Sequence, residues 1–131
     1  ISFISSGRLL TLATLVIPQM FKKENLRSMD EKVQEIIEVA ETHDPEGIVA
    51  SVKGMAARED NTTFMNELST PIIAFYGDSD YYFPMERIEK LIASTPHVNS
   101  VIVPNSGHNS YLESPTFVVE KIVEFITTRS C

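Results

Sequence analysis

Cysteine is almost absent from this chain of 131 residues, since the one thiol belongs to Cys131 at the last position. A single thiol cannot close a disulfide within the chain, so a disulfide-built secreted fold is excluded. Long apolar runs are missing as well: the longest candidate, 9–17, falls short of the roughly 18 to 20 residues that cross a bilayer and is interrupted by Thr11 and Thr14. No charged and apolar leader is evident. We therefore expect a cytoplasmic protein without a membrane partner.

Basic residues are also scarce. Eleven Lys and Arg side chains stand against eighteen Asp and Glu, which gives a formal net charge of −7. Nucleic acids and anionic membranes are bound by clustered Lys and Arg, whereas here the basic residues are scattered among acids. We therefore expect neither as a partner. No His or Cys spacing typical of a metal site occurs in the sequence, and we expect no cofactor.

What the chain does have is the apolar content of an ordinary folded domain. Hydrophobic residues make up 43% of the sequence and charged residues 22%, so the chain can bury a core and is not disordered. Its first residues, ISFIS at 1–5, predict a buried β-strand, and there is no initiator Met. Because termini normally lie at the surface, domains seldom begin inside a buried strand. We therefore expect the chain to be part of a longer fold.

Helix signals dominate the first half of the chain after that strand. Residues 8–21 carry apolar side chains at helical spacing and favour a helix that ends near Pro18. The sequence at 28–31, Ser-Met-Asp-Glu, has the form of a capping box and predicts the start of a second helix. Asp44 and Pro45 predict a third, with Asp as the N-cap and Pro in the first turn, where its missing N–H costs nothing.

The second half alternates strands with helices. Near-continuous apolar runs at 71–76 and 98–103 predict buried strands, and helices are expected after Pro84 and from Ser114. Such strands indicate a parallel sheet covered on both faces, so we predict an α/β fold with three parallel strands, flanking helices and a helical insertion of about 60 residues. The predicted divisions are the first strand and helix at 1–20, the insertion at 21–69, and the remaining α/β core at 70–131.

Polar side chains follow the two later strands, at the edge where ligands bind in such sheets. Asp78 and Asp80 come after the first of these strands, and His108 comes after the second. Each alone is weak evidence, because Asp is common in turns and a loop histidine is ordinary. Together, an Asp and a His can share a hydrogen bond in which the carboxylate orients the imidazole and stabilises its protonated form, as a catalytic dyad requires. His43 and His97, which lie between elements, are interpreted as structural.

In these segments the chain resembles the C-terminal half of an α/β-hydrolase. The family's acid turn has the form G-x-x-D ahead of a proline, as in GDSDYYFP at 77–84. Its histidine turn, which precedes a final helix, resembles GHNSYLESP at 107–115, and GMAARED at 54–60 is similar to cap sequences of enol-lactonase-like and esterase-like members. The resemblance covers essentially the whole chain. It implies that Asp80 is the catalytic acid, that His108 is the catalytic base, and that the insertion is a helical cap.

The family's nucleophile elbow, G-x-S-x-G, does not occur in this sequence. No two of the five glycines have the required spacing, and no glycine-rich oxyanion loop is found either. Ser5 and Ser6 lie at the end of the first predicted strand but lack the glycines of an elbow. We therefore expect the nucleophile to lie upstream, in an N-terminal half of the same fold that would be the partner of this chain.

The resemblance implies the hydrolysis of a carboxylic ester or lactone by a Ser-His-Asp triad, with a small-molecule substrate between the sheet edge and the cap. Candidate pocket walls are Tyr81, Tyr82, Met20 and Phe21, although ordinary packing is the alternative for all four. Two other interpretations stay open. An upstream Asp nucleophile would give an epoxide hydrolase or a haloalkane dehalogenase. A chain that never meets a nucleophile would be a non-catalytic remnant, or a binding or structural fragment.

Overall fold

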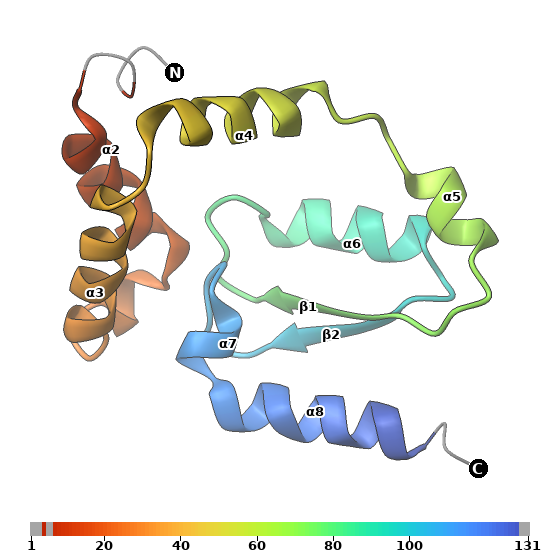
Figure 1. The fold of residues 1–131 in the computed structure, drawn as a ribbon. Coiled ribbons are helices and arrows are strands. Elements are labelled where there is room, and N and C mark those ends of the chain that lie inside the picture. The colour runs from red at the N-terminus through yellow and green to blue at the C-terminus, as the bar shows by residue number, and fades with distance from the viewer. Residues whose placement is uncertain (1–3, 5–6, 129–131) are drawn as a thin grey trace.

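The computed structural model of the protein describes residue 4 and residues 7–128 (Figure 1). The chain first forms a group of helices and then two parallel strands with a helix along each side. In chain order the elements are α2 (Leu9–Val16), the 3-10 helices η1 (Ile17–Met20) and η2 (Lys23–Asn25), α3 (Asp30–Glu41), α4 (Pro45–Ala57), α5 (Thr62–Glu67), β1 (Ile73–Gly77), α6 (Met85–Ser94), β2 (Asn99–Val103), α7 (Ser110–Glu113) and α8 (Pro115–Thr127).

The sheet of the described residues consists of β1 and β2. The strands run parallel, from the pair Ile73 and Asn99 to the pair Gly77 and Val103. α6 lies along one side of the two strands and α8 along the other (Figure 1), which explains why the strands are apolar almost throughout. The α/β architecture is confirmed for these two strands. The remaining predicted strand, the first in the chain at 1–5, lies outside the described residues except for Ile4. That residue is helical and buried.

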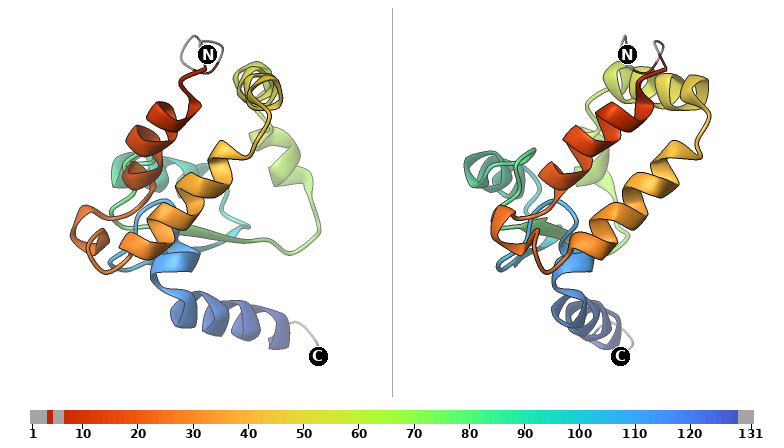
Figure 2. Two further views of the ribbon diagram at one scale, coloured as in Figure 1. Left: turned by 60° about the vertical axis from the view of Figure 1, so that its left-hand side comes forward. Right: turned by 90° about the vertical axis from the view of Figure 1, so that its left-hand side faces the viewer.

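The helices that precede β1 have a core of their own. α2 and α3 lie side by side in both views of Figure 2, and α4 then crosses beyond them toward α5. The buried side chains between α2, η1 and α3 are Ala13, Ile17, Phe21, Val33 and Ile37. The predicted helix at 8–21 is confirmed as α2 followed by η1. The predicted division after residue 20 falls inside this buried cluster, because α2 packs against α3.

One predicted helix cap is confirmed and another is wrong, although both helices begin where expected. The Asp44 carboxylate accepts hydrogen bonds from the N–H groups of Glu46 and Gly47 at 3.2 Å each, so it caps α4 as expected. The predicted capping box at the start of α3 does not form. The N-cap of that helix is Met29, and the Ser28 hydroxyl instead donates to the carbonyl of Asn25. Ser28 lies in the turn before α3, and its hydroxyl points back toward Asn25. The hydroxyl therefore does not bond to the first N–H groups of the helix.

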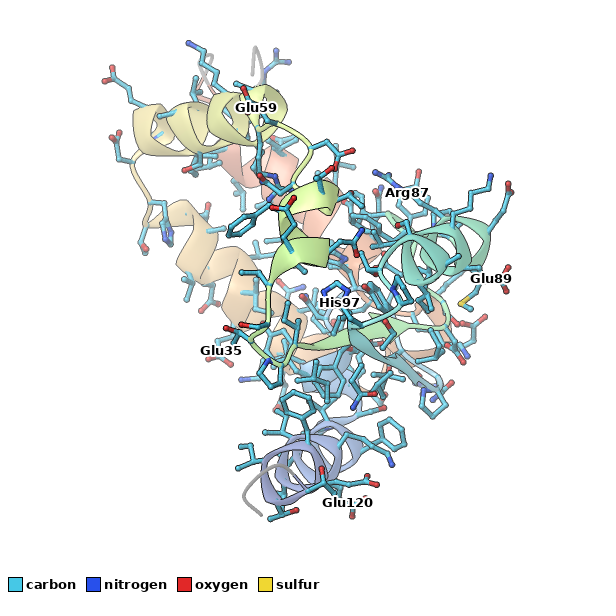
Figure 3. All side chains as sticks on the ribbon, turned by 90° about the vertical axis from the view of Figure 1, so that its right-hand side faces the viewer. Glu35, Glu59, Arg87, Glu89, His97 and Glu120 are labelled. Carbon is cyan, nitrogen blue, oxygen red and sulfur yellow. The ribbon has the colours of Figure 1, made fainter. Side chains whose placement is uncertain are left out.

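Charged side chains cover much of the surface, as the outward-pointing Glu59, Glu89 and Glu120 illustrate (Figure 3). Two helices leave apolar side chains exposed. None of the side chains of α4 is fully buried. On α8 an exposed apolar stripe at helical spacing is formed by Val119, Ile122, Val123 and Ile126. Within the described residues, none of the helices combines the length and the apolar character that a bilayer span requires.

Candidate active site

The carboxyl ends of β1 and β2 are joined by backbone contacts. The Asp78 N–H donates to the Val103 carbonyl at 3.1 Å, and the Ser79 N–H donates to the Ser106 carbonyl at 2.9 Å. This close approach requires glycine at the end of β1, because a Cβ on Gly77 would lie 2.0 Å from the Gly107 carbonyl oxygen. The turn after β1 and the turn after β2 therefore form one compact unit.

The Asp78 carboxylate holds this unit together. Its two oxygens accept hydrogen bonds from the N–H groups of Asn105 and Ser106, at 2.9 and 3.2 Å, and from the Ser79 hydroxyl. Partial burial by itself would raise the pKa of Asp78, but the hydrogen bonds from Asn105, Ser79 and Ser106, helped by the charge of Lys22, hold it below the usual aspartate value. Asp78 is thus engaged in fixing the turn that precedes His108.

Asp80 contacts the histidine directly. Its Oδ2 lies 2.8 Å from His108 Nδ1, while its Oδ1 accepts hydrogen bonds from the N–H groups of Tyr82 and Phe83, at 2.8 and 3.2 Å. The Asp80 side chain is 6% exposed and the His108 side chain is 41% exposed. A shielded carboxylate therefore orients a histidine whose other nitrogen, Nε2, forms no hydrogen bond with any described residue.

Aromatic rings flank the imidazole. The Tyr82 ring meets it edge-on, with ring centroids 5.6 Å apart, and the Phe83 ring stacks on it at 5.9 Å with an interplanar angle of 9°. The Tyr82 hydroxyl donates to the Val16 carbonyl at 3.4 Å, so this tyrosine links α2 to the histidine. Burial, together with the charges of Tyr81 and Asp80, raises the pKa of Tyr82 above its ordinary value. Sequence reasoning placed Tyr82 in the site but missed Phe83.

A second residue missed by sequence reasoning is Glu113, at the end of α7. One of its carboxylate oxygens accepts from the Gly107 N–H at 2.6 Å, and the other accepts from the Lys22 N–H and the Asn25 side-chain amide at 2.9 Å each. Glu113 thereby ties the turn that carries His108 to η2 and the residue before it. The only sequence signal for it was its place in LESP, the motif that follows the histidine turn.

The other three candidate pocket residues, Tyr81, Phe21 and Met20, lie in different environments. Tyr81 is 66% exposed and its ring meets Tyr82 edge-on at 5.4 Å. Phe21 is 4% exposed in the core between α2 and α3, and Met20 packs against the same core while its carbonyl accepts from the Asn109 N–H, next to the histidine. A lining role for these side chains stays a prediction.

The other two histidines lie apart from Asp80. His43 Nδ1 is 2.8 Å from the Val39 carbonyl at the end of α3, and His97 lies in the connection between α6 and β2, before the strand rather than after it (Figure 3). Across residue 4 and residues 7–128, no cluster of three or more His, Cys, Asp or Glu side chains could hold a metal ion.

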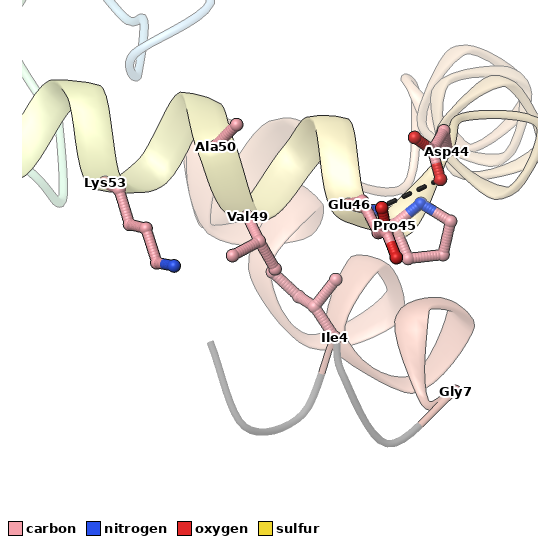
Figure 4. A pocket seen from close by; sticks show the side chains of 8 residues that line it. All are labelled: Ile4, Gly7, Asp44, Pro45, Glu46, Val49, Ala50 and Lys53. Atoms are coloured by element: carbon pink, nitrogen blue, oxygen red, sulfur yellow. Dashed lines mark hydrogen bonds between the residues drawn. The ribbon is translucent and has the colours of Figure 1, made fainter.

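Two open hollows are lined by described residues, and neither has Asp80 or His108 in its wall. The first, of about 700 Å³, lies between Ile4 and the start of α4, where Val49 points toward Ile4 (Figure 4). Of its charged wall residues, Asp44 caps α4, and the others are Glu46 and Lys53.

The second hollow, of about 810 Å³, lies between α5, β1 and α6. Its wall includes Phe83, whose ring stacks on His108, together with Arg87 and Tyr76. The hollow therefore lies next to the candidate site, although Asp80 and His108 do not belong to its wall.

Comparison with known proteins finds similarity among solved structures. No family model matches the sequence, and no curated protein is significantly similar to it. Solved structures do match. A thermophilic esterase from Thermogutta terrifontis is 28% identical with a TM-score of 0.83, over 92% of this chain and 44% of its own.

Two further structures match more of this chain at lower identity. The enol-lactonase from Burkholderia xenovorans LB400 is 18% identical with a TM-score of 0.84, over 96% of this chain and 48% of its own. An α/β-hydrolase enzyme from a Medee basin deep-sea metagenome library is 18% identical with a TM-score of 0.77, over 96% and 47%. The chain thus spans less than half the length of each of these proteins.

Proposed function

We propose that this chain, whose fold is that of the C-terminal half of an α/β-hydrolase, supplies the acid and the base of a Ser-His-Asp hydrolase acting on a small carboxylic ester or lactone. The observation that carries the proposal is the 2.8 Å contact between Asp80 Oδ2 and His108 Nδ1, at the carboxyl ends of two parallel strands. Ligands of open α/β sheets bind at this edge.

The chemistry of the pair follows from its hydrogen bonds. An ionised carboxylate can only accept, so Nδ1 of His108 donates its proton to Asp80 and Nε2 keeps a lone pair. A lone pair on an exposed Nε2 can remove the proton of a nucleophile. The positive charge that then forms on the imidazole is stabilised by the shielded Asp80 carboxylate.

The proposed nucleophile is a serine from the N-terminal half of the same fold. Its hydroxyl would attack the carbonyl carbon of the substrate while Nε2 of His108 takes the proton. The tetrahedral intermediate would collapse to an acyl-enzyme as His108 returns the proton to the leaving alkoxide, and water would then release the acid by the same route. The esterase and the lactonase among the similar structures favour this chemistry over an aspartate nucleophile.

The N-terminal half is itself a proposed partner. Within the described residues β1 pairs with β2 alone, so its other edge is available to a further strand. The small-molecule substrate would then lie between the completed sheet edge and the helical insertion, next to Tyr81 and Tyr82.

The test is ester and lactone turnover by the full-length protein. We expect p-nitrophenyl acetate to be hydrolysed, and we expect His108→Ala to abolish all but a small fraction of that activity. The matched control is His97→Ala, because His97 is also exposed but lies before β2. Equal rates in the parent and in His108→Ala would refute the assignment. A full-length protein without any hydrolase activity would favour the non-catalytic alternative.

A further inference from the structure

We propose that Phe83 is a positioning residue for His108. Its ring, secured by Arg87, keeps the imidazole plane in the orientation that proton transfer requires. The inference rests on the proposed function, because it assumes that His108 is the base. It concerns a contact that the sequence pattern does not show.

The geometry places two restraints on the imidazole. One is the hydrogen bond from Nδ1 to Asp80, and the other is the Phe83 ring, which lies nearly parallel to the imidazole with 5.9 Å between centroids. The distance between the Phe83 and His108 ring centroids is within the range of offset stacking between aromatic rings. The Tyr82 ring meets the imidazole on edge at 69°, so it contacts a different part of the ring.

Phe83 is itself held in place from two directions. Its N–H donates to Oδ1 of Asp80, the same carboxylate that binds His108 through Oδ2. Its ring lies 4.6 Å from the guanidinium carbon of Arg87, in the first turn of α6, a cation–π contact. One carboxylate thus fixes both the imidazole and the backbone of the residue that stacks on it.

A second restraint is needed for a physical reason. The torsion that turns an imidazole about its bond to Cβ has a broad energy profile, so one hydrogen bond at Nδ1 leaves the plane free to tilt. Tilting moves Nε2, which is the atom that must meet the nucleophile. Because proton transfer depends on this alignment, a displacement near 1 Å can cost on the order of 100-fold in rate. A ring stacked on the imidazole opposes the tilt.

The direct test is the NMR spectrum of the His108 ring in full-length protein labelled at histidine, with the signals assigned through His108→Gln. A stacked phenyl ring shifts the imidazole carbon-bound protons upfield. We expect Phe83→Leu to remove that shift and Phe83→Tyr to retain it. Arg87→Met should reduce it in part, because the phenyl ring then loses its cation. An unchanged shift in Phe83→Leu would overturn the stacking.

The kinetic test separates positioning from general stability. We expect Phe83→Leu to lower kcat about 10-fold or more with little change in KM, and Phe83→Tyr to restore most of the rate. The matched control is Phe117→Leu on α8, since Phe117 also lies beneath a cation, Lys121 at 6.0 Å, but does not contact His108. Loss of kcat in both Leu variants alike would contradict the proposal.

The outcomes of the two tests distinguish a failure of the proposed function from a failure of the positioning role. If the full-length protein hydrolyses no ester while the upfield shift depends on Phe83, the stacking stands and the proposed function falls. If ester turnover requires His108 but is the same in Phe83→Leu and in the parent, the proposed function stands and Phe83 has no positioning role. Should Phe83→Leu fail to fold, Arg87→Met still decides, because an undiminished shift and kcat would count against the proposal.

Discussion

Asp78 and Asp80 are separated by one serine, yet their carboxylates serve different partners. Asp80 shares its oxygens between the His108 imidazole and two backbone N–H groups of its own turn. Asp78 reaches across to the backbone N–H groups of Asn105 and Ser106. One acid orients the histidine side chain and the other positions the turn that leads to it, so substitutions of the two should have different consequences.

Replacing Asp80 by Asn should leave the fold intact and reduce kcat by about 10³- to 10⁴-fold. The Asn side chain can still accept from Tyr82 and Phe83 through its oxygen, but its NH₂ group then faces Nδ1 of His108 and favours the wrong tautomer. The measurement is ester hydrolysis by the full-length variant, with circular dichroism as a check of folding. Asp44→Asn is the control, because Asn is an equally good N-cap and Asp44 lies at α4. A rate close to that of the parent would remove Asp80 from the mechanism.

Replacing Asp78 by Asn should make stability less sensitive to acid. The folded state holds the pKa of Asp78 below its ordinary value, so the ionised carboxylate contributes stability that is complete above the unfolded pKa. This contribution disappears as the pH falls through the lowered folded pKa. The variant lacks the contribution at every pH, so its deficit relative to the parent should shrink between about pH 5 and pH 2.

Urea unfolding midpoints across that pH range would measure the difference between the parent and Asp78→Asn. The same series on Asp60→Asn is an informative comparison, because hydrogen bonds from Thr62 also lower the pKa of Asp60 although that residue is exposed. A deficit of constant size for Asp78→Asn would mean that its carboxylate does not act through its charge.

Gly77→Ala should destabilise the protein severely, by about 3 kcal/mol or more, because the new methyl group would lie 2.0 Å from the Gly107 carbonyl oxygen and 2.4 Å from that of Ser106. Both obstacles are backbone atoms, so the two strand ends would have to separate. In contrast, Gly54→Ala in α4 meets no atom within 4 Å and should stabilise the helix by about 0.5 to 1 kcal/mol. Thermal or urea unfolding of the two variants would test this, and similar effects of both would contradict it.

The 131-residue chain studied alone should self-associate. The apolar stripe of α8 is formed by side chains with 37% to 58% of their surface exposed, namely Val119, Ile122, Val123 and Ile126. An exposed apolar stripe of this kind favours association. We expect the double variant Val119→Lys, Val123→Glu to shift the chain toward monomer, as measured by size exclusion with light scattering.

Val39→Lys is the control for that prediction, since Val39 is 52% exposed on α3 but lies outside the stripe. Its oligomeric state should match that of the parent chain. If the double variant associates as strongly as the parent, the edge of β1 opposite β2 becomes the stronger candidate for the contact. A parent chain that is monomeric at high concentration would rule out both surfaces.

Part of this structure was predictable because the signals are local. The apolar runs of β1 and β2, the Asp44–Pro45 start of α4 and the position of His108 after a strand depend on residues close together in the chain. The capping box at 28–31 failed because a matching pattern does not determine where a hydroxyl points: a turn stabilised by the Asn25 carbonyl competes for Ser28.

The sequence by itself determined the alternation of strands and helices from β1 onward, the acidic and histidine turns, and the lack of a nucleophile elbow. Tertiary structure alone decided which groups act on the imidazole. Glu113 meets the Lys22 N–H from 91 residues away, and Phe83 meets His108 across the sheet edge. Periodicity describes which residues are buried, but such contacts depend on how two strand ends and a helical insertion come together in space. That is why the contact between Asp80 and His108 could be predicted and the contact between Phe83 and His108 could not.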